Sequence, residues 1–549
     1  MVMLSDPPLR GSATITGVFF DRSRDIAAVA SEFPLLVNPR ARAAYGGQAL
    51  RYRVALYRRG ESAPFAAFDG LRFPVNDVAF HPTQSVVAIG AGSYDGGYLF
   101  EGEFIAWDWR GGRHARFFGD IPEVARCAYD ADGNGITAWV RPWDEEWEGL
   151  PDTPDAAFNT LYRVHVPYGD ATWSGAAARV LALSGRDIAP AEEAPPAAAP
   201  APGALLAQWL GLDSLEQRGA IHDVAWLDGD RVAVTHRGCL LEIHHTGGGP
   251  AVRYAGDGYG SQIILSAGVY VHAAAPAERS SPGWTQDSQL YRLTEDGLEL
   301  VQAYQGELAF SASAGGALLG RMNRYPPAAQ ARDLLRDLHS GRELRVDLGH
   351  YDCFNHHIRI DGAPWLFALQ GTPASSHENK YLCIVHAEGG IQRLWPVLKA
   401  DGKPASHAME LSGCYLDDAQ GPGIVIGGRH YAPDARGACA GFIYRKRLDK
   451  NETLWRHPAH ASPAAIVALP EPGLVAAAFL DGSLMLVDAA TGGIRLNAKL
   501  RVEGLPTVVY AMSARGGRLA MGTADGRIAV MAADALLRQG AAQEWAEIG

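Results

Sequence analysis

The segment around residue 350 carries the residue types and spacing of a metal site. Its H-x2-C-x2-H-H pattern is formed by His350, Cys353, His356 and His357. Imidazole and thiolate groups are the ligands that zinc prefers. Successive side chains of a β-strand point to opposite faces, however, so His356 and His357 cannot both face one ion. We therefore expect these residues to serve the fold, and we assign no metal ligand.

The segment 130–135 has the spacing of the opening of a calcium loop. Asp130, Asp132 and Asn134 place oxygen atoms at alternate positions, as such loops require. The twelfth position, where a bidentate glutamate belongs, is Arg141. Asp, Asn and Gly are also the residues that tight turns need. A plain hairpin turn is therefore the favoured interpretation.

The usual local motifs of enzymes are missing from the sequence. It contains no P-loop, no H-E-x-x-H zinc motif and no G-x-S-x-G nucleophile motif. We assign no catalytic residue and no cofactor, and we expect a protein that is not an enzyme, although the absence of these motifs does not exclude one. An enzyme whose site is assembled from separate repeats stays open, because such a site needs no local motif.

An acidic segment lies beside two tryptophans, Trp143 and Trp147. Charge runs usually form a solvated surface, but this one could also receive a basic partner. Both interpretations stay open. The carboxylates are Asp144, Glu145, Glu146, Glu148, Asp152 and Asp155.

Composition and charge narrow the class of protein. The 549 residues include 49 Lys and Arg against 61 Asp and Glu, for a formal net charge of −12. That net charge argues against electrostatic binding of nucleic acid over a wide surface, because such binding needs a basic face on the protein. Hydrophobic residues at 47% and charged residues at 20% are typical of a globular chain. The 63 glycines and 33 prolines predict many turns and short elements.

The ends and the cysteines predict a cytoplasmic protein that does not enter a membrane. The first residues carry neither a basic segment nor an apolar stretch of secretory length. No run of 18 apolar residues occurs. The cysteines are scattered without a C-x-x-C pair and are expected to be buried free thiols. They are Cys127, Cys239, Cys353, Cys383, Cys414 and Cys439.

A repeat of short strands and hairpin turns runs along the whole chain. Segments 474–488 and 519–530 each read as an apolar strand, an Asp-Gly turn and a second apolar strand, which is a hairpin signature. Segment 75–80 is echoed by 221–226. We count ten units, of which the fifth to eighth are degenerate. Their first strands begin near Ile15, Val75, Val124, Ile221, Gln262, Glu307, His357, Met409, Ile466 and Val508.

The repeat predicts an all-β fold. Units of three or four short strands cannot bury both faces alone and must stack on neighbours, and the repeat length favours a β-propeller of about ten four-stranded units. The chain resembles the WD-repeat family of β-propellers in a few signature residues. These are Trp107-Asp108 at the end of a third strand, Gly349-His350 and Asp352 ahead of Asp361-Gly362, and the variant Val487-Asp488. The resemblance implies the fold, while function is set by sites placed on it.

The expected organisation is units 1–3 in residues 1–186, an insertion in 187–219, and units 4–10 in 220–549. A seven-blade ring formed by the last units alone would leave three blades with exposed edges, so we expect one array, as one large ring or two fused rings. The insertion begins with an Ala/Pro linker and continues into a helix within 204–217. A capping helix is favoured over a partner-docking helix on the evidence of its apolar residues, Leu205, Leu206, Trp209, Leu210 and Leu212.

The long loops are expected to join the same pair of strands, the second and the third, in each unit that has one. Connections between first and second strands are short, whereas those between second and third strands are long in seven units, and family geometry places them on one face. Loops on a rigid scaffold often carry function. The long connections are 31–49, 91–102, 141–159, 273–288, 321–331, 371–379 and 429–440.

These loops contain the residue types that anchor protein interfaces. Packing of the loops on one another is the alternative role for each residue. The candidate partner-binding residues are Tyr94, Tyr98, Trp143, Trp147, Trp284, Arg324, Tyr325, Arg429, His430 and Tyr431.

The sequence therefore predicts a non-catalytic protein-interaction scaffold or recognition subunit. In general appearance the chain also resembles bacterial propellers that accompany MoxR-type AAA+ ATPases and von Willebrand A proteins, which implies such a protein as partner. The alternative is a propeller enzyme or small-molecule sensor with a ligand, metal-assisted or not, in the central channel. Nucleic-acid binding would need a local arginine patch, and we do not predict it.

Overall fold

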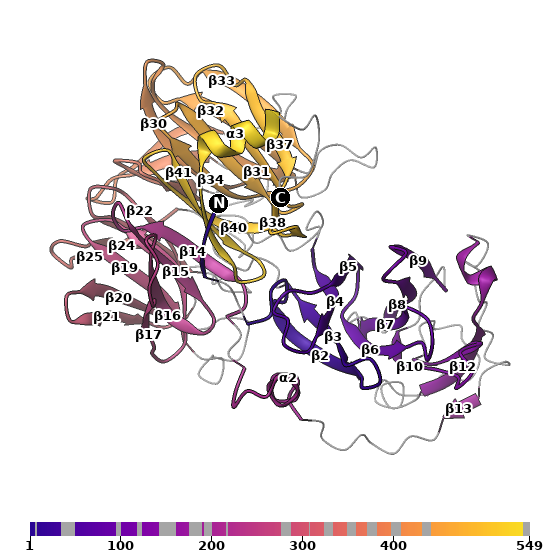
Figure 1. Cartoon of the computed structure of the whole chain (residues 1–549). Coiled ribbons are helices and arrows are strands. Elements are labelled where there is room, and N and C mark those ends of the chain that lie inside the picture. The colour runs from indigo at the N-terminus through magenta and orange to yellow at the C-terminus, as the bar shows by residue number, and fades with distance from the viewer. Residues whose placement is uncertain are drawn as a thin grey trace. The chain divides into compact units, whose positions relative to one another are not determined.

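The computed structural model describes the chain except for residues 6–7, 34–49, 95–99, 118–122, 142–160, 175–188, 192–199, 216–217, 276–286, 307, 323–332, 349–357, 371–380, 397–407, 431–440 and 542–549. The chain divides into two compact units. The seven-blade unit consists of Met1–Asp6, Pro34–Ala49 and Arg218–Gly549, and the three-blade unit consists of Pro7–Phe33 and Leu50–Gln217. Figure 1 traces both units by colour along the chain.

The three-blade unit is built from three four-stranded antiparallel sheets, each with its strands in chain order. It also holds the short helix η1 (Asp170–Trp173) and helix α2 (Pro202–Leu210). Its blades are β2 (Thr14–Asp21), β3 (Ile26–Glu32), β4 (Tyr52–Arg58) and β5 (Ala66–Leu71); β6 (Val75–Phe80), β7 (Val86–Tyr94), β8 (Phe100–Asp108) and β9 (Arg113–Arg116); and β10 (Val124–Tyr129), β11 (Gly135–Val140), β12 (Leu161–Pro167) and β13 (Ala189–Ala191).

The first three blades of the seven-blade unit repeat this plan. They are β14 (Ile221–Trp226), β15 (Arg231–His236), β16 (Cys239–His245) and β17 (Val252–Tyr254); β18 (Tyr259–Leu265), β19 (Val269–Ala274), β20 (Ser288–Thr294) and β21 (Gly297–Tyr304); and β22 (Leu308–Ala312), β23 (Ala317–Met322), β24 (Asp333–Asp337) and β25 (Glu343–Val346).

The fourth blade is irregular, because its first strand, β26 (Arg359–Asp361), pairs in parallel with the first strand of the next blade. Its other strands are β27 (Leu366–Gln370), β28 (Tyr381–Val385) and β29 (Ile391–Pro396). The fifth and sixth blades are β30 (Ala408–Asp418), β31 (Gly421–His430), β32 (Gly441–Arg447) and β33 (Thr453–Ala459), then β34 (Pro463–Leu469), β35 (Leu474–Phe479), β36 (Ser483–Asp488) and β37 (Ile494–Lys499).

The last blade takes its fourth strand from the other end of the chain. A small hairpin of β38 (Arg501–Val502) and β39 (Leu505–Pro506) precedes β40 (Val509–Arg515), β41 (Arg518–Thr523), β42 (Ile528–Ala532) and helix α3 (Ala533–Ala541). Strand β1 (Val2–Ser5) pairs antiparallel with β42, with Val2 opposite Val530 and Met3 opposite Ala529. Figure 1 shows the N-terminus beside these yellow strands.

The seven blades close a ring among themselves. Their first strands contact one another in the order β14, β18, β22, β26, β30, β34 and β40, and β40 contacts β14 again. The all-β propeller of ten units is confirmed. Of the arrangements considered from sequence, the seven-blade ring is the one that forms. The sequence argument did not favour this ring, because it leaves the first three blades outside it with exposed edges. Within the ring, β1 pairs with β42 and completes the last blade.

A repeated hydrogen bond, from a backbone N–H of one first strand to an aspartate of the neighbouring first strand, joins adjacent blades. The Asp77 carboxylate accepts the backbone N–H of Cys127 at 2.8 Å, and the Asp223 carboxylate accepts that of Ile263 at 2.8 Å. Each aspartate follows a register shift in its strand, and bulges of this kind re-aim side chains. The echo between 75–80 and 221–226 therefore encodes blade-to-blade contact, since a buried carboxylate must find donors.

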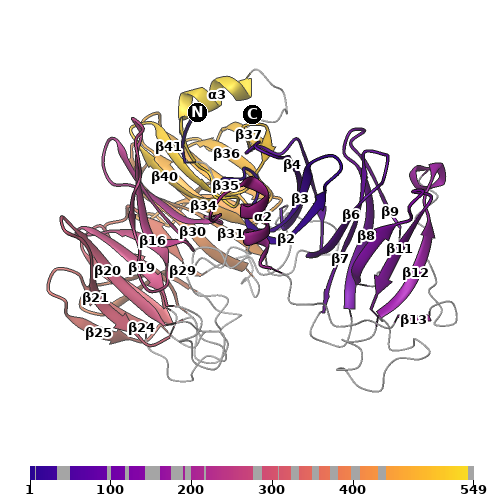
Figure 2. The ribbon, with the colours of Figure 1, turned by 60° about the horizontal axis from the view of Figure 1, so that its bottom comes forward.

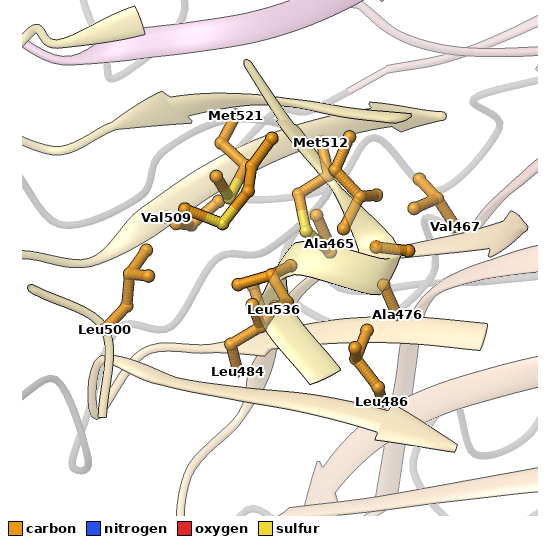
Figure 3. Packing of buried hydrophobic residues seen from close by; sticks show 14 of the residues in the cluster. Ala465, Val467, Ala476, Leu484, Leu486, Leu500, Val509, Met512, Met521 and Leu536 are labelled. Carbon is orange, nitrogen blue, oxygen red and sulfur yellow. The ribbon is translucent and has the colours of Figure 1, made fainter. Parts of the chain in front are cut away.

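The apolar core lies between adjacent blades, as Figure 3 shows for the two C-terminal blades. Small and branched residues from β34, β35 and β36 meet Met512 and Met521 from β40 and β41, and Leu536 of helix α3 joins them with its side chain fully buried. Burial of such residues supplies the main free energy that holds neighbouring blades together.

Close packing of backbones predicts a large effect at Gly260, which lies in β18. A Cβ added there would lie 2.0 Å from the carbonyl oxygen of Leu240 in the preceding blade. We expect Gly260→Ala to lower the free energy of unfolding by about 1–3 kcal/mol, because β16 and β18 must move apart. Gly229→Ala is the matched control, since nothing lies within 4 Å of its Cβ. Denaturant unfolding of both variants is the measurement, and equal stability of the two would contradict the packing.

Candidate functional site

The candidate partner-binding residues lie mostly outside the described part of the chain. Tyr94 and His430 are the last residues of strands β7 and β31. Arg429 lies in β31, and its side chain is 3% exposed, so it lies within the blade. The others fall outside the described residues and stay predictions: Tyr98, Trp143, Trp147, Trp284, Arg324, Tyr325 and Tyr431.

The strand boundaries confirm the class of the long connections. In six of the seven blades with a predicted long connection, the connection between the second and third strands is longer than the one between the first and second strands. In the second blade β7 and β8 extend into 91–102 and leave 95–99, which is no longer than 81–85, the connection between β6 and β7. The connections that join strands of the three-blade unit are 33–51, 95–99 and 141–160, and those that join strands of the seven-blade unit are 275–287, 323–332, 371–380 and 431–440. Since strands within a blade alternate in direction, these connections leave one end of the blades within each unit.

The opposite end of the seven-blade ring holds a cavity in the central channel. Its volume is about 430 Å³, and residues from all seven first strands line it. They come from the second half of each strand or from the turn that follows, as Leu265, Gly362 and Pro470 illustrate. The cavity therefore lies toward the turns between first and second strands, away from the long connections. Figure 2 labels three of these first strands, β30, β34 and β40, from a second direction.

Arg359 crosses this channel and ties three blades together. Its Nη1 lies 2.8 Å from a carboxylate oxygen of Asp223, and its Nη2 donates to the carbonyl of Ile263 at 2.8 Å. Its Nε donates to Asp361 at 2.6 Å. The Arg359 side chain is 11% exposed and that of Asp223 is fully buried. The guanidinium spreads its donors over three nitrogens in one rigid plane, whereas the three donors of a lysine leave a single nitrogen.

Electrostatics hold the bridge in its charged form. Burial alone would lower the pKa of Arg359, but the carboxylates of Asp361 and Asp223 raise it above its ordinary value. Burial raises the pKa of the Cys414 thiol and of the Tyr415 phenol, both of which line the cavity. These two groups are therefore neutral near pH 7. Among the described residues that line the cavity, Arg359 and Asp361 carry charge, and Asp223 is the buried partner of Arg359.

A second cluster, on strands β15 and β16, has metal-binding residue types. The side chains of His236, Cys239 and Glu242 are buried, with one potential ligand atom from each within 4.8 Å of the others. Its H-x2-C-x2-E spacing repeats the spacing of His350, Cys353 and His356. That spacing was the signal by which sequence reasoning could have found this cluster.

The hydrogen bonds of this cluster do not fit a metal ion. His236 accepts the N–H of Gly238 at Nδ1, at 3.0 Å, so its Nε2 carries the proton and donates to Glu242 at 2.8 Å. Arg218 forms a bidentate ion pair with the Glu242 carboxylate. Burial raises the pKa of the Cys239 thiol to about 11. A metal would need a free imidazole lone pair and a thiolate, so we interpret the cluster as structural.

The other candidate segments have the following outcomes. The segment 130–135 is the turn between β10 and β11, as the hairpin interpretation predicted, and Asp130 lies 2.8 Å from His165 Nε2. The segment from His350 to His357 and the acidic residues from Asp144 to Asp155 lie outside the described residues. Four of the six cysteines are described, and all four are buried free thiols, as expected.

The helix predicted within 204–217 is α2, and it packs against the blades of its own unit. Leu206 is fully buried against Val29, Ala55 and Tyr57 of the three-blade unit. The Trp209 indole N–H donates to Asp25 at 3.3 Å. The capping role is therefore the one observed, and the helix ends at Gly211, whose left-handed conformation terminates it.

A buried histidine in a blade of the seven-blade unit predicts that stability depends on pH. His272 in β19 is 2% exposed, and burial lowers its pKa to about 3 from an unfolded value of 6.5. In the folded state the imidazole of His272 stays neutral, whereas in the unfolded chain it takes up a proton below pH 6.5. Stability is thus full above pH 6.5 and falls as the pH drops toward 3, by at most about 1.4 kcal/mol per unit.

We expect His272→Gln to lose less stability than the unchanged protein between pH 7 and pH 5, by about 2 kcal/mol. Chemical denaturation at the two pH values is the measurement. His460→Gln, at an exposed histidine, is the control and should keep the pH dependence of the unchanged protein. If His272→Gln lost as much stability between pH 7 and pH 5 as the unchanged protein, the buried imidazole would not be the source of the pH dependence.

Comparisons with known proteins add little to these observations. No family model and no curated protein matches the chain. Among solved structures, the crystal structure of the computationally designed Ika8 protein is similar to 58% of this chain and 97% of its own, at 11% identity and a TM-score of 0.36. Within the described residues, no helix is long and apolar enough to cross a membrane.

Proposed function

We propose that this protein is a non-catalytic interaction scaffold that binds a protein partner through the long connections between second and third strands. One observation carries the proposal: four such connections leave the same end of the seven-blade ring. Chain length concentrated at one end of a rigid β scaffold is the arrangement by which loops form binding surfaces.

The described polar clusters also support a scaffold over an enzyme. His236, Cys239 and Glu242 satisfy one another in a buried network, and Arg359 bridges the channel with its charge balanced by carboxylates. The Cys239 thiol lies 3.2 Å from His236 Nε2, but all three side chains are buried and burial raises the pKa of the thiol to about 11, so the thiol is not an activated nucleophile near pH 7. Arg359 ties blades together and offers no nucleophile. The cavity favours ligand binding as the second candidate role.

The proposal extends to the family, the partner and the compartment. The quoted Trp-Asp and Gly-His residues support membership of the WD-repeat family, and the general resemblance supports a MoxR-type AAA+ ATPase or a von Willebrand A protein as partner. A recognition subunit of an ATPase-driven system in the cytoplasm is the resulting role.

Affinity capture from native cell extract, read by mass spectrometry, tests the scaffold. The trimmed variant replaces 371–380 and 431–440 by short Gly-Ser turns. The control variant shortens 246–251, which joins the third and fourth strands at the opposite end of the first ring blade. We expect a stoichiometric partner with the unchanged protein and the control, and its loss from the trimmed variant. A partner retained by the trimmed variant would move the site elsewhere, and capture of none would contradict the scaffold.

A further inference from the structure

The central channel of the seven-blade ring contains a cavity whose described lining consists mainly of hydrocarbon side chains. Its volume of about 430 Å³ falls in the range of small-ligand sites. Residues from all seven first strands or from the turns that follow them contribute, so walls surround the cavity about the ring axis. The larger apolar residues of the lining are Val224, Ile264, Leu265, Phe310, Val467 and Met512. A cavity of this kind is suited to the hydrocarbon part of a small molecule.

The cavity leaves apolar surface open to water. Leu265, the last residue of β18, lines the cavity and is 47% exposed. The remaining apolar lining is largely alanine, whose methyl groups leave space in the channel unfilled; these residues are Ala225, Ala312, Ala314, Ala468 and Ala514. A hydrocarbon molecule in this space would remove apolar surface from water and supply the dispersion contacts that the walls lack. Binding of such a molecule is therefore favourable.

The charged residues of the described lining, Arg359 and Asp361, already bond each other. The Nε of Arg359 donates to Asp361 at 2.6 Å, and its Nη2 donates to the Ile263 carbonyl at 2.8 Å. Its Nη1 pairs at 2.8 Å with Asp223, whose carboxylate also accepts the backbone N–H groups of Val224 and Ile263 at 2.8 Å each. An ion that entered the cavity would therefore lose its hydration at a place where the fixed charges are already engaged with each other. An uncharged molecule avoids that loss.

We propose that this cavity binds an uncharged organic molecule with a compact hydrocarbon body. The class comprises alicyclic or branched alcohols, ketones and esters, whose few polar atoms need no charged partner. The site lies at the end of the ring opposite the long connections, so it does not rest on the proposed scaffold function; it defines the class of ligand for the second candidate role.

Calorimetric titration of the full chain tests the charge and the size of the ligand. Three probes share one adamantane cage and differ in charge: 1-adamantylmethanol, 1-adamantylmethylammonium and 1-adamantanecarboxylate. We expect the alcohol to bind and both ions to bind at least about tenfold more weakly, because each ion must lose hydration. A fourth probe, 2,2-dimethylpropan-1-ol, keeps the alcohol group but lacks most of the hydrocarbon cage, and it should also bind at least about tenfold more weakly.

Two variants fill the cavity from different blades. Ala468→Leu in β34 and Ala514→Leu in β40 each replace a methyl group of the lining by a larger side chain, and each should weaken binding of 1-adamantylmethanol at least about tenfold. Ala303→Leu is the matched control, because Ala303 is an exposed residue of β21, the outer strand of its blade; it should bind the alcohol as the unchanged protein does. Unfolding curves verify that each variant is folded, and either filled variant suffices if the other does not fold.

Any of four results would overturn the proposal. They are binding of either ion as tightly as 1-adamantylmethanol, equally tight binding of 2,2-dimethylpropan-1-ol, no binding of 1-adamantylmethanol to the unchanged protein, and unchanged affinity for it in a folded Ala468→Leu or Ala514→Leu variant. None of these results bears on capture of a protein partner at the long connections, so the two proposals fail separately.

Discussion

Replacing Arg359 by methionine is expected to lower the free energy of unfolding of the seven-blade unit by about 3–5 kcal/mol. The substitution removes the guanidinium that pairs with the fully buried Asp223 carboxylate, and removing one partner of a buried ion pair is strongly destabilising. It also removes the donor to the Ile263 carbonyl, so the ring loses a tie among three blades.

Two further variants make that result specific. Arg495→Met removes a guanidinium that is 58% exposed and pairs with Asp488 at 3.1 Å, and exposed pairs contribute less than about 1 kcal/mol. Arg359→Lys keeps the charge but holds its donors on a single nitrogen, so it should fall between the other two. Guanidinium chloride unfolding followed by fluorescence is the measurement. A stability of Arg359→Met equal to that of Arg495→Met would mean that the bridge does not stabilise the ring.

Starting the chain at residue 6, without strand β1, is expected to lower the stability of the seven-blade unit by about 2–4 kcal/mol and to cause self-association. The loss has two parts: the partly buried Met3 and Leu4 leave the apolar clusters of their neighbours, and the ladder with β42 disappears. The self-association follows because β42 becomes an unpaired edge.

Light scattering coupled to size-exclusion chromatography, together with denaturant unfolding, measures both consequences. Val2→Lys is the matched control, because Val2 belongs to β1 but is 51% exposed; it should change stability by less than about 0.5 kcal/mol. If the shortened chain kept its mass and its unfolding midpoint, β1 would not be the closure of the ring.

Local sequence signals were sufficient to predict the repeat. Each of the ten predicted first strands begins within three residues of an observed one, including the degenerate units at Gln262 and His357. The reason is physical: hairpin turns and alternating apolar residues are encoded within one blade, and the antiparallel order follows from short turns. The class of the long connections was predictable for the same reason.

Long-range features were not predictable from one sequence. Arg359 pairs with an aspartate 136 residues earlier in the chain, and strand β1 pairs residue 2 with residue 530; no local pattern encodes either contact. The cluster of His236, Cys239 and Glu242 is different, because its spacing is local and its hydrogen bonds were needed to assign a structural role.

Hydrogen–deuterium exchange of the chain, alone and with its co-purified partner, tests the scaffold most directly. The account predicts slower exchange on partner binding in the connections 275–287, 323–332, 371–380 and 431–440, with little change in the turns 227–230, 266–268 and 470–473 at the other end of the ring. Slower exchange confined to those turns, with the long connections unchanged, would contradict binding through the long-connection end.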